Sequence, residues 1–271
     1  TNALSLLVGG ALAVSAGADP MAVAVTTAFL VGIFQVAAGF FRLGAIVDFI
    51  SAPVVAGYIT GAAILIGVGQ LKNLSQTDAE RGHLLHRIIS WLDGLDEVST
   101  AAMAMGLGTL ALILVLKRFF PRVPAPMAAM AVATAVAMNL DLKATGLRVV
   151  ADLSPVPQGF PPFTLPDFSL IPSLIPLAIA ATVLSLVESS AVARSIAGET
   201  GQPLDADVEF SGQGFANLAA AFSGGYPVSG SLSRSALNHR AGGKSRFAGV
   251  FAGGLMLGVL LVLGPLVNYT P

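Results

Sequence analysis

Long runs of residues without a single charge recur along this sequence and restrict its fold more than any other feature. A helix needs about 20 predominantly apolar residues to cross the roughly 30 Å hydrocarbon core of a bilayer. The charge-free runs near this length are residues 1–18, 21–41, 49–71, 98–116, 123–140, 168–187, 210–233 and 247–271. Only 11% of the residues are charged, whereas soluble domains carry about 25%. The pattern predicts an all-α, polytopic membrane protein.

Two stretches between these runs are predicted to lie outside the membrane. Residues 72–97 are polar and include Trp91, a residue type that suits a membrane interface. Residues 141–171 are rich in proline and predict an extended, ordered loop. Because the chain starts at Thr1 within one apolar run and stops at Pro271 after another, we expect it to be part of a longer protein.

Several classes of function lack support in the sequence. The net charge of −1 gives no reason to expect nucleic acid as a partner, and the absence of cysteine excludes disulfides and thiolate metal sites. The three histidines, His83, His86 and His239, fall in predicted loops without a carboxylate at metal-ligand spacing. No nucleophile and base pair supports an intramembrane enzyme. We therefore expect no metal, no cofactor and no enzymatic activity.

The region 207–246 departs from the pattern of simple spans. A helix from Asp207 to Phe222 would cover only about 24 Å. Residues 223–230 contain three glycines and a proline and are predicted to be extended. Only about two helical turns then remain in residues 231–239, roughly half a bilayer. Non-helical backbone at this depth is tolerated only inside protein or around a cavity, so the region predicts a discontinuous helix of the kind found in secondary transporters.

The residues at the start of that half-helix favour an anion site. Ser229 or Ser231 would cap the helix, and the spacing of Ser231, Arg234 and Ser235 puts these three on one face. Free N–H groups, hydroxyls and a positive field would then bind an oxyanion. The alternative is that the serines are small packing residues and that Arg234 extends to a nearby membrane surface.

Glu188 is the second charge inside a predicted span, since it follows the uncharged run 168–187. Arg194, six residues later, marks the end of the span, which places Glu188 about 9 Å inside that boundary. A carboxylate at this depth is costly unless it has a role or a partner. It would serve as a proton or cation coupling site, or form a structural ion pair with Arg234 or Arg194.

Other polar residues inside apolar runs have simpler interpretations. Thr1 and Asn2 could cap a second half-helix that faces the one at Ser231, or could merely head a fragment. Gln35 and Gln70 are predicted to be hydrogen-bond partners between helices.

The stretch from Tyr226 to Asn238 (YPVSGSLSRSALN), followed by Gly242-Gly243-Lys244-Ser245, resembles the signature of the SulP family of sulfate permeases, also called solute carrier 26 anion transporters. Other segments are similar to the same family in the same order. These are residues 1–5 (TNALS), 39–44 (GFFRLG), 49–58 (FISAPVVAGY) leading to 70–72 (QLK), and 188–194 (ESSAVAR).

The resemblance implies a fold of fourteen segments in two inverted repeats of seven, with a core and a gate domain. Residues 1–271 would be an incomplete transport domain, about segments three to eleven, without the family's cytoplasmic STAS domain. The implied substrate site lies between two facing half-helix N-termini with short extended segments at the midplane. Its residues would be Thr1, Asn2, Ala3, Ser231, Leu232 and Ser233, with Arg234 supplying a positive field and Glu188 acting as the coupling residue.

The function implied is secondary active transport of a sulfate-like anion, bicarbonate or a dicarboxylate by alternating access, in a bacterial inner or other plasma membrane. Sodium-coupled bicarbonate relatives have an aspartate at the position of Glu188 and a threonine at that of Val192, which favours proton coupling here. The alternatives are an anion channel or exchanger, a sodium-coupled bicarbonate transporter, and a nucleobase transporter of the same architecture, against which the serine-rich residues 229–235 argue. A homodimer formed through parts outside this chain is also expected.

Overall fold

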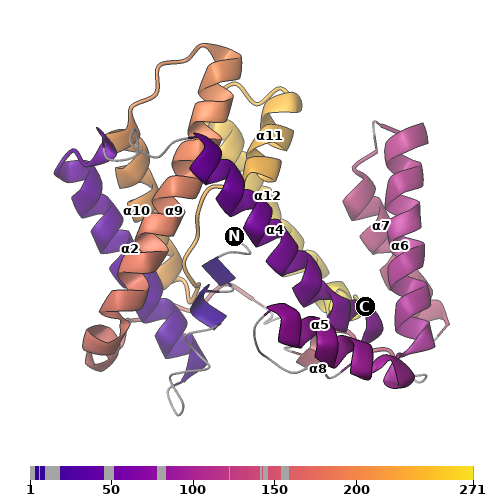
Figure 1. Cartoon of the computed structure of the whole chain (residues 1–271). Helices are drawn as coiled ribbons and strands as arrows, with labels where there is room; N and C mark the ends of the chain where they lie inside the picture. The colour runs from indigo at the N-terminus through magenta and orange to yellow at the C-terminus, as the bar shows by residue number, and fades with distance from the viewer. Residues whose placement is uncertain are drawn as a thin grey trace. The chain divides into compact units, whose positions relative to one another are not determined.

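The computed structural model describes residues 4–5, 7–9, 19–45, 52–77, 84–121, 123–140, 142, 146–153 and 159–270. Within these ranges the regular elements are helices and no strand occurs, which confirms the predicted all-α class. The α-helices are α2 (Pro20–Phe40), α4 (Ala52–Ser75), α5 (Leu84–Asp93), α6 (Thr100–Phe119), α7 (Ala125–Asn139), α8 (Val150–Leu153), α9 (Ile171–Thr200), α10 (Ala206–Phe222), α11 (Leu232–Arg240) and α12 (Arg246–Val267), with short 3-10 helices η1 (Leu95–Glu97) and η2 (Phe168–Leu170) (Figure 1).

Four helical stretches among the described residues are long and apolar enough to cross a membrane. They are Pro20–Phe40, Thr100–Phe119, Phe168–Thr200 and Phe247–Gly264. Each overlaps one of the predicted charge-free runs, although Phe168–Thr200 continues well past the end of the run 168–187, and the chain is an integral, multi-pass membrane protein. The outward side chains of α6 agree with this, because Leu107, Leu110 and Leu114 are each at least half exposed, as lipid-facing residues would be.

Three stretches differ from their predicted form. Run 123–140 gives only the 15 residues of α7, about 22 Å long, because Pro124 and Pro126 fix its start and the helix ends at Asn139. Polar residues 72–97 are largely helical, since α4 continues to Ser75 and α5 follows. The predicted loop 141–171 contains the one-turn helix α8, although described residues 159–167 are irregular as expected.

The chain divides into two compact units. One comprises Thr1–Thr60 and Pro161–Phe251, and the other comprises Gly61–Phe160 and Ala252–Pro271. All of the predicted site residues belong to the first unit. In the second unit α6 packs against α7, and Ala102, Ala137 and Leu147 form a small core.

Within the first unit, α2 packs most closely against α10. Gly39 lies against Ser211, whereas Gly32 lies against Leu218, so the two helices run antiparallel. A Cβ atom on Gly214 would lie 2.6 Å from the backbone nitrogen of Val36. Glycines at these positions therefore let the two backbones approach, which is the packing that membrane helices use in place of a hydrophobic driving force.

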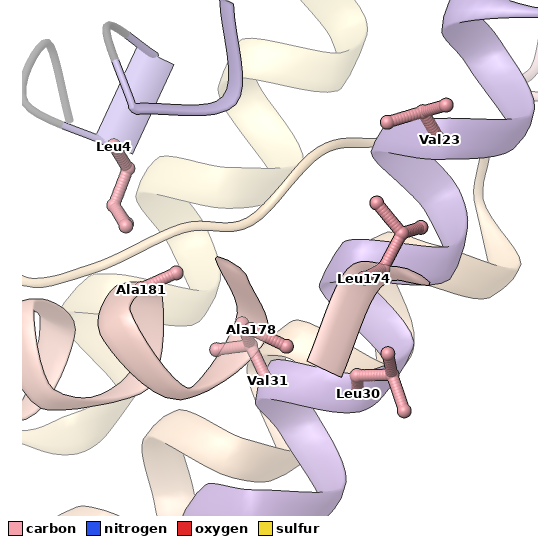
Figure 2. Close-up of a cluster of buried hydrophobic side chains, with 7 residues drawn as sticks. All are labelled: Leu4, Val23, Leu30, Val31, Leu174, Ala178 and Ala181. Carbon is pink, nitrogen blue, oxygen red and sulfur yellow. The ribbon is translucent and has the colours of Figure 1, made fainter. Parts of the chain in front are cut away.

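A buried apolar cluster joins α2 to α9 and to the first described residues (Figure 2). Its members are Leu4, Val23, Leu30, Val31, Leu174, Ala178 and Ala181. The two alanines are fully buried, and their small side chains let α9 lie close to its neighbours. The cluster fixes three segments that are far apart in sequence as one body.

The loop before α9 is also tied to α2. The backbone N–H of Asp167 donates to Thr26 Oγ1 at 2.9 Å. The side chain of Asp167 accepts from the hydroxyl and the backbone N–H of Ser169, and these bonds lower the pKa of the Asp167 carboxyl. The start of α9 is thus held in place against α2.

We expect Gly214→Ala to destabilise the protein by about 1–3 kcal/mol, because its methyl group would collide with the backbone of α2. Gly212→Ala is the matched control in the same helix, since no atom from a neighbouring element in the described part of the chain lies within 4 Å of its Cβ position. Alanine there should be neutral or stabilising by up to about 1 kcal/mol, because alanine favours a helix. Thermal unfolding in detergent measures both variants, and equal shifts would contradict the close α2–α10 packing.

Candidate functional site

The helix break predicted near residue 223 is present in the structure. Helix α10 ends at Phe222, residues 225–231 are not helical, and α11 begins at Leu232. Gly224 turns the chain with a φ of +69°, a conformation that glycine adopts without strain. We define residues 225–231 as the extended segment. Pro227, near its start, is fully buried.

A buried amide holds the peptide of Val228 in this extended segment. Asn217 of α10 accepts from the Val228 N–H at 2.8 Å and donates to the Val228 carbonyl at 3.0 Å. The same carbonyl also accepts from Gln213 at 2.9 Å and from Ser185 at 3.2 Å. Backbone groups that no helix or strand satisfies are therefore paired by side chains, as burial requires.

Gln35 of α2 completes this network. Its amide donates to Ser185 Oγ at 2.9 Å, and its carbonyl oxygen accepts from Asn217 at 2.7 Å. Gln35, Ser185 and Asn217 are all fully buried. The prediction that Gln35 bonds between helices is confirmed, and α2, α9 and α10 converge through it on a single peptide.

Glu188 of α9 lies against the same extended segment. The hydroxyl of Ser229 donates to Glu188 Oε2, and the N–H of Gly230 donates to Ser189 Oγ at 3.0 Å. A Cβ atom on Gly230 would lie 2.9 Å from the Cα atom of Ser189. Only glycine at position 230 lets the extended segment pass this close to α9. The close approach places the carboxylate of Glu188 next to the start of α11.

The start of α11 has the geometry of an open helix N-terminus. Its N-cap residue Ser231 has φ −126° and ψ 109°, and the Ser231 side chain makes no capping hydrogen bond. The first N–H bonded within the helix is that of Ser235, to the Ser231 carbonyl at 2.9 Å. The N–H groups of residues 232–234 therefore have no acceptor within the helix. The helix dipole favours an anion at this end of the helix.

The remaining predicted site residues are Arg234, Leu232, Ser233 and Thr1–Ala3. Arg234 is exposed on the first turn of α11. The backbones of Leu232 and Ser233 belong to α11, but their side chains lie outside what the structure describes. Thr1, Asn2 and Ala3 also lie outside the described residues.

The described residues nearest to Thr1–Ala3 contact the extended segment. Ser5 Oγ donates to the hydroxyl of Tyr226 at 3.0 Å, and Leu4 belongs to the buried cluster with α2 and α9. The beginning of the chain and the segment before α11 are thus neighbours, although more than 200 residues separate them.

Sequence reasoning did not single out Asn217 or Gln213. Asn217 and Gln213 are polar residues inside the uncharged run 210–233, and that isolation is the signal that could have found them. Two buried hydroxyls on α9, those of Thr182 and Ser190, make no hydrogen bond within the described part of the chain. No group of three metal-binding side chains occurs among the described residues.

Comparison with known proteins gives a consistent result. A model of the sulfate permease family matches residues 1–271. A probable sulfate transporter (4.2) of Arabidopsis thaliana is 31% identical over 283 residues, which cover 99% of this chain and 41% of the relative. A probable sulfate transporter of Mycobacterium tuberculosis is 30% identical over 275 residues, which cover 100% of this chain and 49% of the relative. The chain thus spans half or less of these two relatives.

The fold resembles that of solved membrane proteins. The transmembrane domain of BicA, a cyanobacterial bicarbonate transporter, matches with a TM-score of 0.84 and 20% sequence identity. The match covers 99% of this chain and 68% of that domain. At this identity the likeness bears on the fold alone.

We expect Asn217→Leu to destabilise the protein by about 1–3 kcal/mol, because it removes the buried side-chain acceptor that pairs the N–H of Val228. The matched control is Asn139→Leu, since Asn139 is exposed and its amide donates to the carbonyl of Ala135 in its own helix. That change should stay within about 0.5 kcal/mol. Thermal unfolding compares the two, and equal losses would show that the Asn217 pairing does not hold the segment.

Proposed function

Since the chain belongs to the sulfate permease family, we propose that it forms the anion-binding part of a secondary active transporter for small anions. The observation that carries this proposal is the extended segment before α11, which interrupts a run of uncharged residues and puts a helix N-terminus beside Glu188. Discontinuous helices of this kind bind substrates near the midplane of transporters.

The proposed anion site combines two helix N-termini. One is that of α11, with Ser231, Leu232 and Ser233, and each N-terminus contributes about half a positive charge. The other is formed by Thr1, Asn2 and Ala3, and the hydrogen bond between Ser5 and Tyr226 supports its position near the extended segment. Arg234 adds a positive field without being buried.

Glu188 is the proposed coupling residue. Its carboxylate accepts from Ser229, two residues before the cap of α11. A protonated carboxyl group can donate instead of accept, so protonation would change the bond that reaches the extended segment. It would also remove a negative charge close to the bound anion, which lowers the cost of carrying that anion across the membrane.

A proton is favoured over sodium because of the residue one turn after Glu188. This residue is Val192, a buried apolar side chain on the same helix. Its side chain has no oxygen to offer, whereas hard cations are bound by oxygen ligands. A sodium site built on Glu188 would therefore lack a ligand from this position.

Sulfate is the first substrate to test, because both curated relatives described above are named as sulfate transporters. Bicarbonate and dicarboxylates would fit the same N–H and hydroxyl groups. We further propose that the two compact units correspond to the core and gate domains of an alternating-access transporter. The core unit would hold the complete anion site, since all its residues fall in that unit.

Replacement of Glu188 by glutamine should abolish stimulation by a proton gradient, because the amide cannot change its protonation state. Uptake of radiolabelled sulfate by the full-length protein in proteoliposomes, with and without an inward proton gradient, measures this effect. Glu199→Gln is the matched control on α9, since Glu199 is exposed and its ion-pair partner among the described residues is His239, at a long 3.7 Å. Gradient-stimulated uptake that persists in the Glu188 variant would exclude this residue as the coupling site.

Loss of Ser233 and Arg234 together (Ser233→Ala with Arg234→Ala) should weaken the apparent affinity for the anion about tenfold or more. This corresponds to about 1.4 kcal/mol or more, near the lower end of the roughly 1.5–3 kcal/mol that a hydrogen bond to a charged group contributes. Leu237→Ala is the control on α11, because Leu237 is exposed and apolar. The KM for sulfate uptake is measured, and an unchanged KM in the double variant would place the anion elsewhere.

A further inference from the structure

Helix α5 has an arrangement of side chains that the transport site does not explain. It belongs to the second unit, and none of its residues is fully buried. Leu85, Ile89 and Leu92 are 72%, 56% and 50% exposed. Their spacing of four and three residues places them in one stripe along the helix. The surface of a membrane protein faces either water or lipid, so the question is which of the two contacts this stripe.

The exposed surface of α5 is divided sharply between apolar and polar residues. At 100° per residue, Leu85, Ile89 and Leu92 fall within a sector of about 60°, while His86 and Asp93 lie about 90° and about 70° from its centre, on one side of it. His86 and Asp93 are also exposed. A helix in water needs no such division, whereas a helix at a membrane surface puts one sector into lipid and the other into water.

The side of α5 that carries neither the apolar stripe nor His86 and Asp93 contacts the protein, and this contact fixes the position of the helix. Trp91 Nε1 donates to Ser75 Oγ at 3.0 Å, so α5 lies beside the end of α4 (Figure 1). Arg87 Nη1 lies 3.8 Å from the Cβ position on Gly69, about two turns before Ser75 in α4. Trp91 and Arg87 are both partly buried, so this side of α5 is already occupied.

Ser75 also lies next to the start of a helix that is suited to cross the membrane. It is the last residue of α4, and its carbonyl accepts from the N–H of Ser99 at 3.1 Å. Ser99 caps α6, which begins at Thr100 and is one of the helices suited to cross the membrane. The start of a spanning helix and the anchor point of α5 therefore lie at the same level.

We propose that α5 lies in the plane of the membrane surface, with Leu85, Ile89 and Leu92 inserted among the lipid acyl chains. The partner is the bilayer itself, at the boundary between headgroups and hydrocarbon. His86 and Asp93 face water, and Trp91 lies at the interface, where tryptophan is enriched. The second unit is thereby anchored to one face of the bilayer through a helix that does not cross it.

The test uses the absence of cysteine from the chain. Single cysteines at Leu85, Ile89, Leu92, His86 and Asp93 are introduced into the full chain, labelled with a nitroxide and reconstituted in phospholipid vesicles. Collision with oxygen, which partitions into lipid, is compared with collision with a water-soluble nickel chelate. The references are Leu114 on the exposed face of α6 for lipid and the exposed Gln202 for water.

We expect labels at Leu85, Ile89 and Leu92 to collide more with oxygen, as at Leu114, and labels at His86 and Asp93 to collide more with the chelate. If the three apolar positions behave like Gln202, the stripe faces water and the proposal is wrong. If they exclude both reagents, protein such as a second copy of the chain covers them, and the proposal is wrong as well.

A second measurement needs no substitution, because Trp91 is the only tryptophan of the chain. Its fluorescence should be quenched when the vesicles contain lipids brominated near the headgroup end of the acyl chain. Bromines near the bilayer centre should quench it less. Absence of quenching by either lipid would contradict a position of α5 at the surface. None of these outcomes depends on transport, so the proposal can fail while the proposed function stands, and the reverse.

Discussion

The architecture of the first unit depends on how a single stretch of non-helical backbone is satisfied away from water. In hydrocarbon each unpaired backbone group costs several kcal/mol, and the extended segment 225–231 has no neighbouring strand among the described residues. The side-chain amide of Asn217 makes the hydrogen bonds that a neighbouring strand would otherwise make, because it offers one donor and one acceptor to the peptide of Val228. Gln35 in turn orients Asn217. The close α2–α10 contact at Gly32 and Gly214 brings these two amides within reach of each other.

Much of this organisation can be predicted from the sequence. Charge-free runs locate α2, α6, α9 and α12, since a bilayer enforces length and apolarity together. The glycines and proline of residues 223–230 locate the break, and α10 and α11 begin and end within one residue of the expected positions. The family signature around Tyr226–Asn238 agrees with the family match over the whole chain.

Other features depend on tertiary contacts that no local pattern encodes. The role of Asn217 follows from its distance to Val228, 11 residues later, across a reversal of the chain. The sequence analysis did not predict α5, because charged residues interrupt this segment and no uncharged run therefore covers it. The run 123–140 is longer than α7, since a charge-free run can begin before the prolines that set the start of the helix. The facing half-site at Thr1–Ala3 stays a prediction, because these residues lie outside the described part of the chain.

The nine residues of α11 have a consequence for how the protein folds. Isolated helices shorter than about 12–15 residues are only marginally stable, because their few hydrogen bonds do not offset the unfavourable free energy of forming the first turn. Helix α11 therefore has little stability of its own and depends on the contacts that α9 and α10 make with the segment before it. We expect it to be the last element of its unit to become ordered during synthesis and the first to open locally. The anion site would then exist only in the completed fold, so that an incompletely assembled protein carries no binding site open to the membrane.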